Sequence, residues 1–206
     1  RVLLSELARR SYLKRVGRGR YAAKTPTALV LEIALGQESP PLRQPVYEPL
    51  LREVLARLFE EFGDDLVSVA LYGSVAQGVA QPTSDVDLFV VIRGLPLSFY
   101  DRAAIFSEVL GKLHEPKMRL WREAGRYANI DILPFTPEEA EVLRPLYLDF
   151  LFDVLVLFDR RGFMRAVLER LRKRIAELGA RRVTLPSGKW YWRLAERARK
   201  RIEIEL

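Results

Sequence analysis

The fold of the chain is decided by residues 71–91, which read LYGSVAQGVAQPTSDVDLFVV. This stretch starts at the end of an apolar run, Leu66–Tyr72, whose length is typical of a buried strand. Gly73 and Ser74 follow and lead into a short helix. Glycine lets the backbone approach a ligand closely, serine caps helices, and free N–H groups at a helix start bind phosphate oxygens. A second apolar strand, Val86–Ile92, completes the pattern.

Three acidic residues accompany these strands. Asp85 and Asp87 are two positions apart, so their carboxylates point to the same face of a strand, where they repel each other unless a cation lies between them. Asp131 stands in the apolar run Ala128–Leu133, where an acid costs free energy unless it is paired or bound to a metal. Three carboxylates can hold two divalent ions about 3.5–4 Å apart. They therefore predict a metal centre, the alternative being that they only cap and solvate the ends of strands.

The order of these features resembles the DNA polymerase β-like nucleotidyltransferase superfamily. The resemblance covers Leu71 to Phe135 and is closest to the minimal nucleotidyltransferases of archaea and bacteria. It implies an α+β fold, in which a mixed β-sheet is flanked by helices. It also implies transfer of a nucleoside monophosphate from a nucleoside triphosphate, above all ATP, with Mg²⁺ or Mn²⁺ as cofactor and release of pyrophosphate.

The resemblance also assigns roles to individual residues. The implied catalytic and metal-binding residues are Asp85, Asp87 and Asp131. The implied nucleotide-binding residues are Gly73, Ser74, Gly78 and Ser84. One position departs from the family pattern, because many small relatives carry an arginine where this chain has Gln77. Either another Arg or Lys supplies that positive charge, or the triphosphate is bound more weakly.

The charge is unevenly distributed along the 206 residues. Residues 1–45 hold 9 basic and 3 acidic side chains, residues 46–159 hold 10 and 19, and residues 160–206 hold 15 and 5. The acidic middle agrees with a metal centre. The basic ends indicate contact with a polyanion or, equally, solvated helix faces.

Composition excludes several classes of protein. Without cysteine there is neither a disulfide framework nor a thiolate zinc site. No apolar run approaches the roughly 18 residues that a membrane span needs, and no signal peptide is visible, so we expect a cytoplasmic protein. The 27 Arg against 7 Lys fit a thermophile.

The N-terminal segment resembles the second half of a winged helix. Val2–Arg10 has the pattern of the end of a helix, and Tyr12–Ala23 predicts a basic hairpin around Gly17 and Gly19. In a winged helix these elements contact nucleic-acid phosphates. The alternative is a packing or dimerisation module, which would make the protein a homodimer. The residues predicted to touch phosphates are Arg9, Arg10, Lys14, Arg15, Arg18 and Arg20.

The prolines between Gly36 and Pro49 place a domain boundary near residue 40. We therefore expect a winged-helix-like module and linker over residues 1–40, a nucleotidyltransferase domain over 41–180 and a basic, aromatic tail over 181–206. The predicted helices are Glu48–Phe62, Ser98–Leu113, Pro137–Leu148 and Arg161–Leu178. The predicted strands are Leu66–Tyr72, Val86–Ile92, Ala128–Leu133 and Val154–Phe158.

Two functions compete on this reading. The first is a nucleotidyltransferase whose acceptor is a hydroxyl of RNA or of a protein, because the basic ends favour a macromolecule over a small antibiotic. Small relatives act as antitoxins that adenylylate a partner toxin. The second is a nucleic-acid-binding regulator, or an antitoxin-like protein, whose nucleotidyltransferase domain senses nucleotide or is inactive. The second predicts salt-dependent binding of duplex DNA without turnover.

Overall fold

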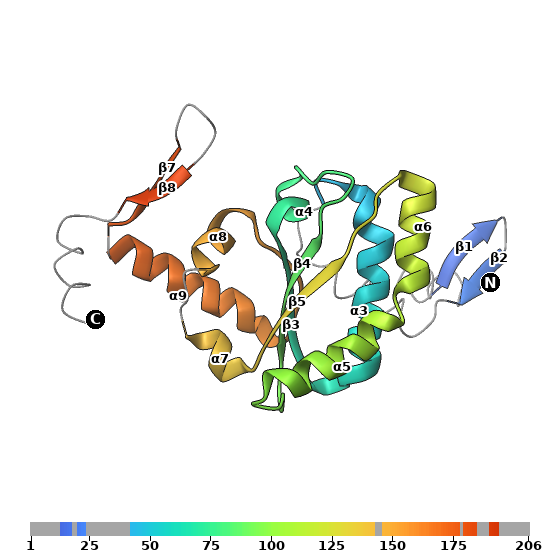
Figure 1. Ribbon diagram of the computed structural model, residues 1–206, viewed down its shortest axis with the longest axis horizontal. Coiled ribbons are helices and arrows are strands. Elements are labelled where there is room, and N and C mark those ends of the chain that lie inside the picture. The colour runs from blue at the N-terminus through green and yellow to red at the C-terminus, as the bar shows by residue number, and fades with distance from the viewer. Residues whose placement is uncertain are drawn as a thin grey trace.

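A four-stranded mixed sheet with helices on both faces forms the centre of the chain (Figure 1). The computed structural model describes residues 13–17, 20–23, 42–142, 146–177, 179–184 and 190–193. The strand order is β5-β4-β3-β6, with β3 antiparallel to both β4 and β6, and β4 parallel to β5. This is the predicted α+β architecture. The strands are β3 (Leu66–Tyr72), β4 (Val86–Ile92), β5 (Ile130–Phe135) and β6 (Leu155–Asp159).

Two groups of helices cover the two faces of the sheet. Helices α3, α5 and α6 pack on one face, and α7, α8 and α9 pack on the other (Figure 1). Short 3-10 turns, η1 (Pro45–Tyr47), η2 (Gly63–Asp65) and η3 (Arg160–Gly162), precede or follow them. The helices are α3 (Glu48–Phe62), α4 (Gly73–Gln77), α5 (Phe99–Gly111), α6 (His114–Ala124), α7 (Pro137–Glu141), α8 (Leu146–Asp153) and α9 (Phe163–Glu177).

Strand β4 is buried on both of its sides. Leu88 and Val90 lie in the core beneath α3, α5 and α6, whereas Phe89 and Val91 lie in the core beneath α8 and α9. A strand covered on both faces has no polar side, which explains the uninterrupted apolar run Leu88–Ile92 that follows Asp87. The central position of β4 fixes the direction of its first residues, Val86 and Asp87, relative to both neighbouring strands.

The prediction for the third strand was wrong by two residues at each end. The strand runs over Ile130–Phe135, not Ala128–Leu133, and it continues through Pro134. Proline lacks an N–H donor, so it normally ends a strand inside a sheet. Strand β5 is an edge strand, where one side needs no ladder partner, and proline is tolerated there.

The remaining helices show two further differences. The single helix predicted over Pro137–Leu148 is two helices, α7 and α8, and α7 ends at Glu141. Pro145 in the following sequence cannot supply the N–H that a continuous helix requires. Helix α6 was not predicted, because its sequence HEPKMRLWREA is mostly polar and buries only Leu120.

Two small antiparallel sheets complete the described elements: β1 (Leu13–Gly17) with β2 (Arg20–Ala23), and β7 (Arg181–Thr184) with β8 (Trp190–Arg193). The first confirms the predicted basic hairpin. The helix predicted over Val2–Arg10 lies outside the described residues, so the winged-helix module stays a prediction. The second shows that the predicted tail contains paired strands. Among the described helices, none combines the length and apolar character that crossing a bilayer requires.

Candidate active site

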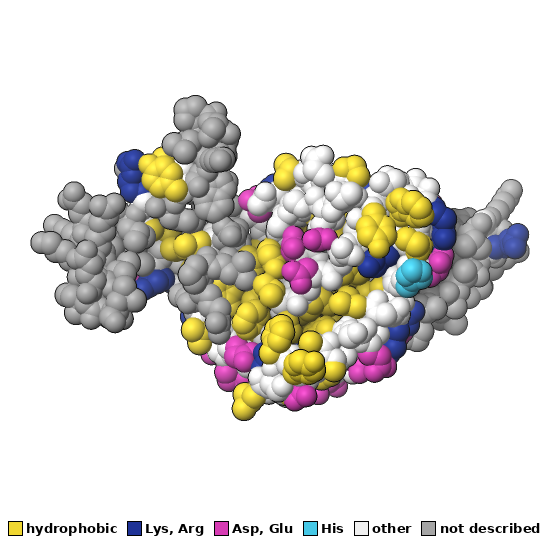
Figure 2. Space-filling model, viewed as in Figure 1, with side chains coloured by type: hydrophobic (Ala, Val, Ile, Leu, Met, Phe, Trp, Pro, Cys, Tyr) yellow, Lys and Arg dark blue, Asp and Glu magenta, His cyan; other side chains and the backbone are white. Residues whose placement is uncertain are grey.

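The structure brings the three predicted aspartates to one end of neighbouring strands. Asp87 is the second residue of β4 and is paired in register with Asp131 of β5. Asp85 precedes Asp87 by two positions, just ahead of the strand. Asp85 and Asp131 are exposed, and Asp87 is partly buried. Figure 2 shows acidic side chains gathered near the centre of this face, over the β4–β5 region.

Gly73 makes room for one of these carboxylates. It follows β3 directly, beside the Tyr72–Asp87 pair of the β3–β4 ladder, and has a φ of 70°. A Cβ atom at this position would lie 2.1 Å from Asp87 Oδ2 and 3.0 Å from its Cγ. Only glycine combines this positive φ with the space that the carboxylate occupies. The Gly-Ser turn and the acidic strand are therefore packed against each other.

The described residues leave the negative charge of these three aspartates without a paired cation. Burial, followed by the charges of Asp131 and Asp85, raises the pKa of Asp87 from 3.8 to about 6. Burial and the charges of Asp87 and Asp131 also raise the pKa of Tyr72. Within the described part of the chain, no Arg or Lys side chain forms an ion pair with any of the three aspartates. Such a group favours a cation from solution.

The chemistry of these donors fits a divalent metal ion. Among the described residues, no three acidic or histidine side chains converge closely enough to hold an ion by themselves. Mg²⁺ does not need such a cluster, because it binds through one or two carboxylates together with water and substrate phosphates. Asp85, Asp87 and Asp131 offer hard oxygen ligands of this kind on adjacent strands.

In metal-free protein, Asp87→Asn is expected to increase the free energy of unfolding near neutral pH. The folded-state pKa of Asp87 is about 6 against an ordinary value of 3.8. Its contribution to stability is therefore fully present below about pH 4 and is lost as the pH rises through about 6. Asparagine does not titrate. Because Asp87 is partly exposed, we expect a gain on the order of 1 kcal/mol at neutral pH.

Urea unfolding in the presence of EDTA measures this difference. Wild type and variant should have equal free energies of unfolding near about pH 4, and these should diverge between about pH 4 and 6. Mg²⁺ should reduce this difference in free energy at neutral pH if Asp87 binds it. A variant that is less stable than wild type near neutral pH would contradict the electrostatic account.

The other predicted nucleotide-binding residues lie in α4, at its C-terminal end and in the loop before Asp85. Ser74 is partly exposed in α4, and its hydroxyl has no hydrogen-bond partner among the described residues. Gly78 ends α4 with a φ of 78°. The Ser84 hydroxyl accepts a hydrogen bond from the Gln81 N–H at 2.9 Å, and the Ser84 N–H donates to the Gln81 carbonyl at 3.0 Å. Ser84 therefore shapes the loop that delivers Asp85.

Sequence reasoning missed Arg43. Its guanidinium donates to the Gln77 carbonyl at 3.1 Å and to Asp153 Oδ1 at 3.2 Å. A Cβ at Gly78 would lie 2.7 Å from the Arg43 Cβ, so the arginine packs directly on the end of α4. The guanidinium of Arg43 thus lies beside Gln77, the position at which the family resemblance implies an arginine. In this chain the guanidinium is paired with Asp153. No local pattern could have identified it, because Arg43 precedes Gln77 by 34 positions within the proline-rich segment.

Comparison with known proteins identifies the family. The family described as "Nucleotidyltransferase domain" matches residues 51–151, a span that contains all three aspartates. The curated protein named "Putative protein adenylyltransferase" from Methanocaldococcus jannaschii is 32% identical over 127 residues, which are 60% of this chain and 79% of that protein. The chain belongs to the nucleotidyltransferase family. The predicted enzyme class is thereby confirmed.

Two more distant proteins are also similar to this chain. The aminoglycoside nucleotidyltransferase (4') of Staphylococcus aureus is 23% identical over 120 residues, 58% of this chain and 42% of that enzyme. The chain thus spans less than half the length of that relative. A chain in the crystal structure of a toxin–antitoxin with AMP-PNP is 13% identical in sequence to this chain. The match covers 62% of this chain and 90% of that chain, with a TM-score of 0.35. A score this low carries no conclusion about function.

The residues predicted to contact nucleic acid are only partly described. Lys14 and Arg15 lie in β1, and Arg20 is exposed in β2. Arg9, Arg10 and Arg18 lie outside the described residues. The hairpin therefore carries basic side chains as predicted, and their contact with nucleic acid stays a prediction.

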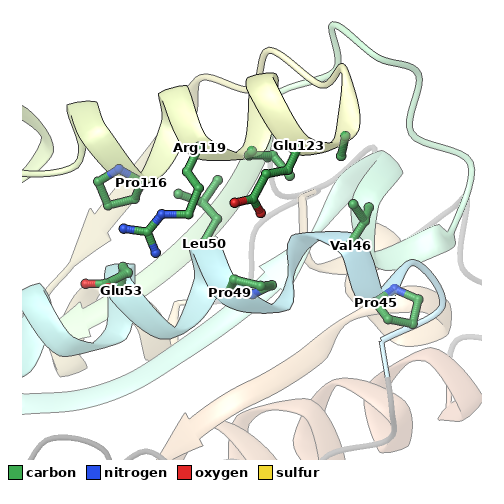
Figure 3. A pocket seen from close by; sticks show the side chains of 10 residues that line it. Pro45, Val46, Pro49, Leu50, Glu53, Pro116, Arg119 and Glu123 are labelled. Carbon is green, nitrogen blue, oxygen red and sulfur yellow. The ribbon is translucent and has the colours of Figure 1, made fainter.

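A separate pocket lies between α3 and α6 of this nucleotidyltransferase (Figure 3). Its volume is about 300 Å³. Prolines and Leu50 form much of its wall, and Arg119 and Glu123 reach into it from α6. It includes none of the three aspartates and is therefore not part of the candidate active site.

Proposed function

We propose that this nucleotidyltransferase transfers a nucleoside monophosphate, most readily AMP from ATP, to a hydroxyl of a macromolecular acceptor, RNA or protein. The carrying observation is the acidic group that Asp85, Asp87 and Asp131 form at one end of β4 and β5, where no described Lys or Arg pairs with it. The Methanocaldococcus jannaschii relative is named "Putative protein adenylyltransferase", and this supports ATP as donor and a protein among the acceptors.

The residues of this group have distinct proposed roles. A bound divalent cation neutralises charge on the triphosphate and lowers the pKa of the acceptor hydroxyl. Asp85, just ahead of β4, and Asp87 in β4 would hold this cation, and Asp131 would face the acceptor from the edge strand. Gly73 leaves the space that the Asp87 carboxylate occupies, and the Ser74 hydroxyl would donate to a phosphate oxygen. Uncompensated carboxylates would otherwise repel the triphosphate, so nucleotide binding requires the cation.

A test incubates the purified protein with each α-labelled nucleoside triphosphate, Mg²⁺ or Mn²⁺, total RNA and cell protein. We expect label to pass from ATP to a macromolecule with wild type and not with Asp85→Ala/Asp87→Ala. Digestion by protease or by ribonuclease then identifies the acceptor class. Thermal melts of both proteins verify that the variant is folded.

The second candidate function, a nucleic-acid-binding regulator, is favoured by the basic hairpin of β1 and β2. It predicts duplex DNA binding that weakens with salt and is lost in Lys14→Ala/Arg15→Ala/Arg20→Ala but kept in Asp85→Ala. Bound nucleotide without any transfer, together with that binding pattern, would overturn the transferase proposal in favour of the regulator.

A further inference from the structure

A groove lies beside Asp131, between α5 and the edge strand β5. Its volume is about 330 Å³, and Asp131 is one of the residues that line it. The rest of the lining is mostly apolar. Its apolar lining includes Phe99, Phe106, Leu110, Ile130, Ile132 and Pro134. The groove therefore leads from an apolar surface directly to the acidic group on which the proposed function rests.

Three large apolar side chains at or next to the start of α5 are highly exposed. Leu97 is 94% exposed, Phe99 is 79% exposed and Tyr100 is 85% exposed. Phe99 belongs to the groove itself, and the other two are its close neighbours in sequence at the start of α5. Figure 2 shows hydrophobic side chains on this face below the acidic group. Clustered exposed aromatic residues are typical of surfaces that bind other proteins.

The charge of the groove disfavours a nucleic acid. Arg102 is the one cation among the residues that line it. Its guanidinium already forms two hydrogen bonds with Glu139, at 2.8 and 2.9 Å, and donates to the carbonyl groups of Pro96 and Pro134. Asp131 and the nearby exposed Asp101 add negative charge. A phosphate backbone needs free Lys or Arg side chains, and the described residues that line the groove offer none.

We propose that this groove is the acceptor-docking surface, and that the acceptor is a protein segment presenting a Tyr, Ser or Thr hydroxyl among apolar and basic side chains. This inference rests on the proposed function and specifies its acceptor. The hydroxyl oxygen forms a bond to the α-phosphorus of ATP, and the bond from that phosphorus to the bridging oxygen of pyrophosphate breaks. The hydroxyl proton passes to Asp131 and then to water, and pyrophosphate leaves.

An array of short synthetic peptides tests the proposal with α-labelled ATP and Mg²⁺. Each peptide carries a central Tyr, Ser or Thr flanked either by apolar residues and lysines or by glutamates, and a central Phe provides the blank. RNA oligonucleotides with free 3′-hydroxyls are spotted beside them. We expect wild type to label the apolar, lysine-flanked hydroxyl peptides preferentially. The variant Leu97→Ser/Phe99→Ser/Tyr100→Ser should label these peptides at least about tenfold more slowly than wild type.

The controls separate docking from nucleotide binding and folding. The three substituted side chains are exposed, so the variant should keep its melting temperature, and its affinity for a fluorescent ATP analogue should be unchanged. Val142→Ser removes a side chain that is 57% exposed outside the groove and should leave labelling unchanged. Labelled RNA, or equal labelling of the peptides by wild type and by the triple variant, would overturn the groove assignment. The proposed nucleotidyl transfer would be unaffected by either result. Nucleotide binding without label in any acceptor would overturn the proposed function as well.

Discussion

Gly73→Ala is expected to lower the rate of nucleotidyl transfer by about a hundredfold, because a displacement of about 1 Å in a catalytic group has an effect of that order. The added Cβ would lie 2.1 Å from Asp87 Oδ2, and its three nearest neighbours all belong to Asp87. The fold can therefore accommodate the methyl group only by moving the Asp87 carboxylate or the turn itself. Steady-state rates of label transfer, at saturating ATP and acceptor, measure the loss.

Gly94→Ala is the matched control. Gly94 has the same φ of 70°, but a Cβ at that position meets nothing within 4 Å. Both variants carry the backbone strain of a non-glycine residue at positive φ, about 1–2 kcal/mol. Only Gly73→Ala also displaces a carboxylate. Equal activity in the two variants would show that the contact between Gly73 and Asp87 is irrelevant to transfer.

Arg102→Met is expected to lower the free energy of unfolding by about 3 kcal/mol, the lower end for breaking a buried ion pair. Arg102 is 7% exposed and connects α5 to β5, to α7 and to the loop at Pro96. Methionine fills similar space but leaves two carbonyl groups and the Glu139 carboxylate without these hydrogen bonds. We choose the lower end because the Glu139 side chain is 32% exposed. The melting temperature should fall by about 6–12 °C.

Arg93→Met provides the comparison, because Arg93 is exposed and donates one hydrogen bond to the Asp64 carbonyl. Its effect should stay within about 0.5 kcal/mol. The double variant Arg102→Met/Glu139→Gln should be more stable than the sum of the single effects predicts, since it removes the stranded charge. A melting temperature of Arg102→Met equal to that of Arg93→Met would contradict the role of the buried pair.

The central elements follow from local sequence. Helix α3 and strands β3 and β4 have the predicted bounds because each is a strong apolar pattern that ends at a glycine or a turn. The spacing of Asp85 and Asp87 placed both at the start of one strand. The apolar run around Asp131 indicated a metal-binding acid, although the structure leaves this side chain exposed. Nothing local states that β5 pairs with β4 in the register that sets Asp131 beside Asp87.

Features made by distant residues were not predictable. Arg43 meets Gln77 and Asp153 only in the folded chain. Glu139 forms the capping box of α7 with Thr136, which local sequence can indicate. It also pairs with the buried Arg102, which is 37 positions away in the sequence. The groove beside Asp131 likewise depends on how α5 packs along β5, and the sequence of neither element specifies that contact.

Pro134 has a consequence for the behaviour of the protein at high concentration. An open strand edge next to an exposed apolar surface invites a second molecule to extend the sheet, which is a common route to aggregation. Here the edge lacks an N–H at Pro134, and the carbonyl of the same residue is held by Arg102 at 3.2 Å. Pro134 thus interrupts the edge of β5 as a template for strand pairing next to the apolar groove. We therefore expect the groove to be exposed without promoting self-association through this edge.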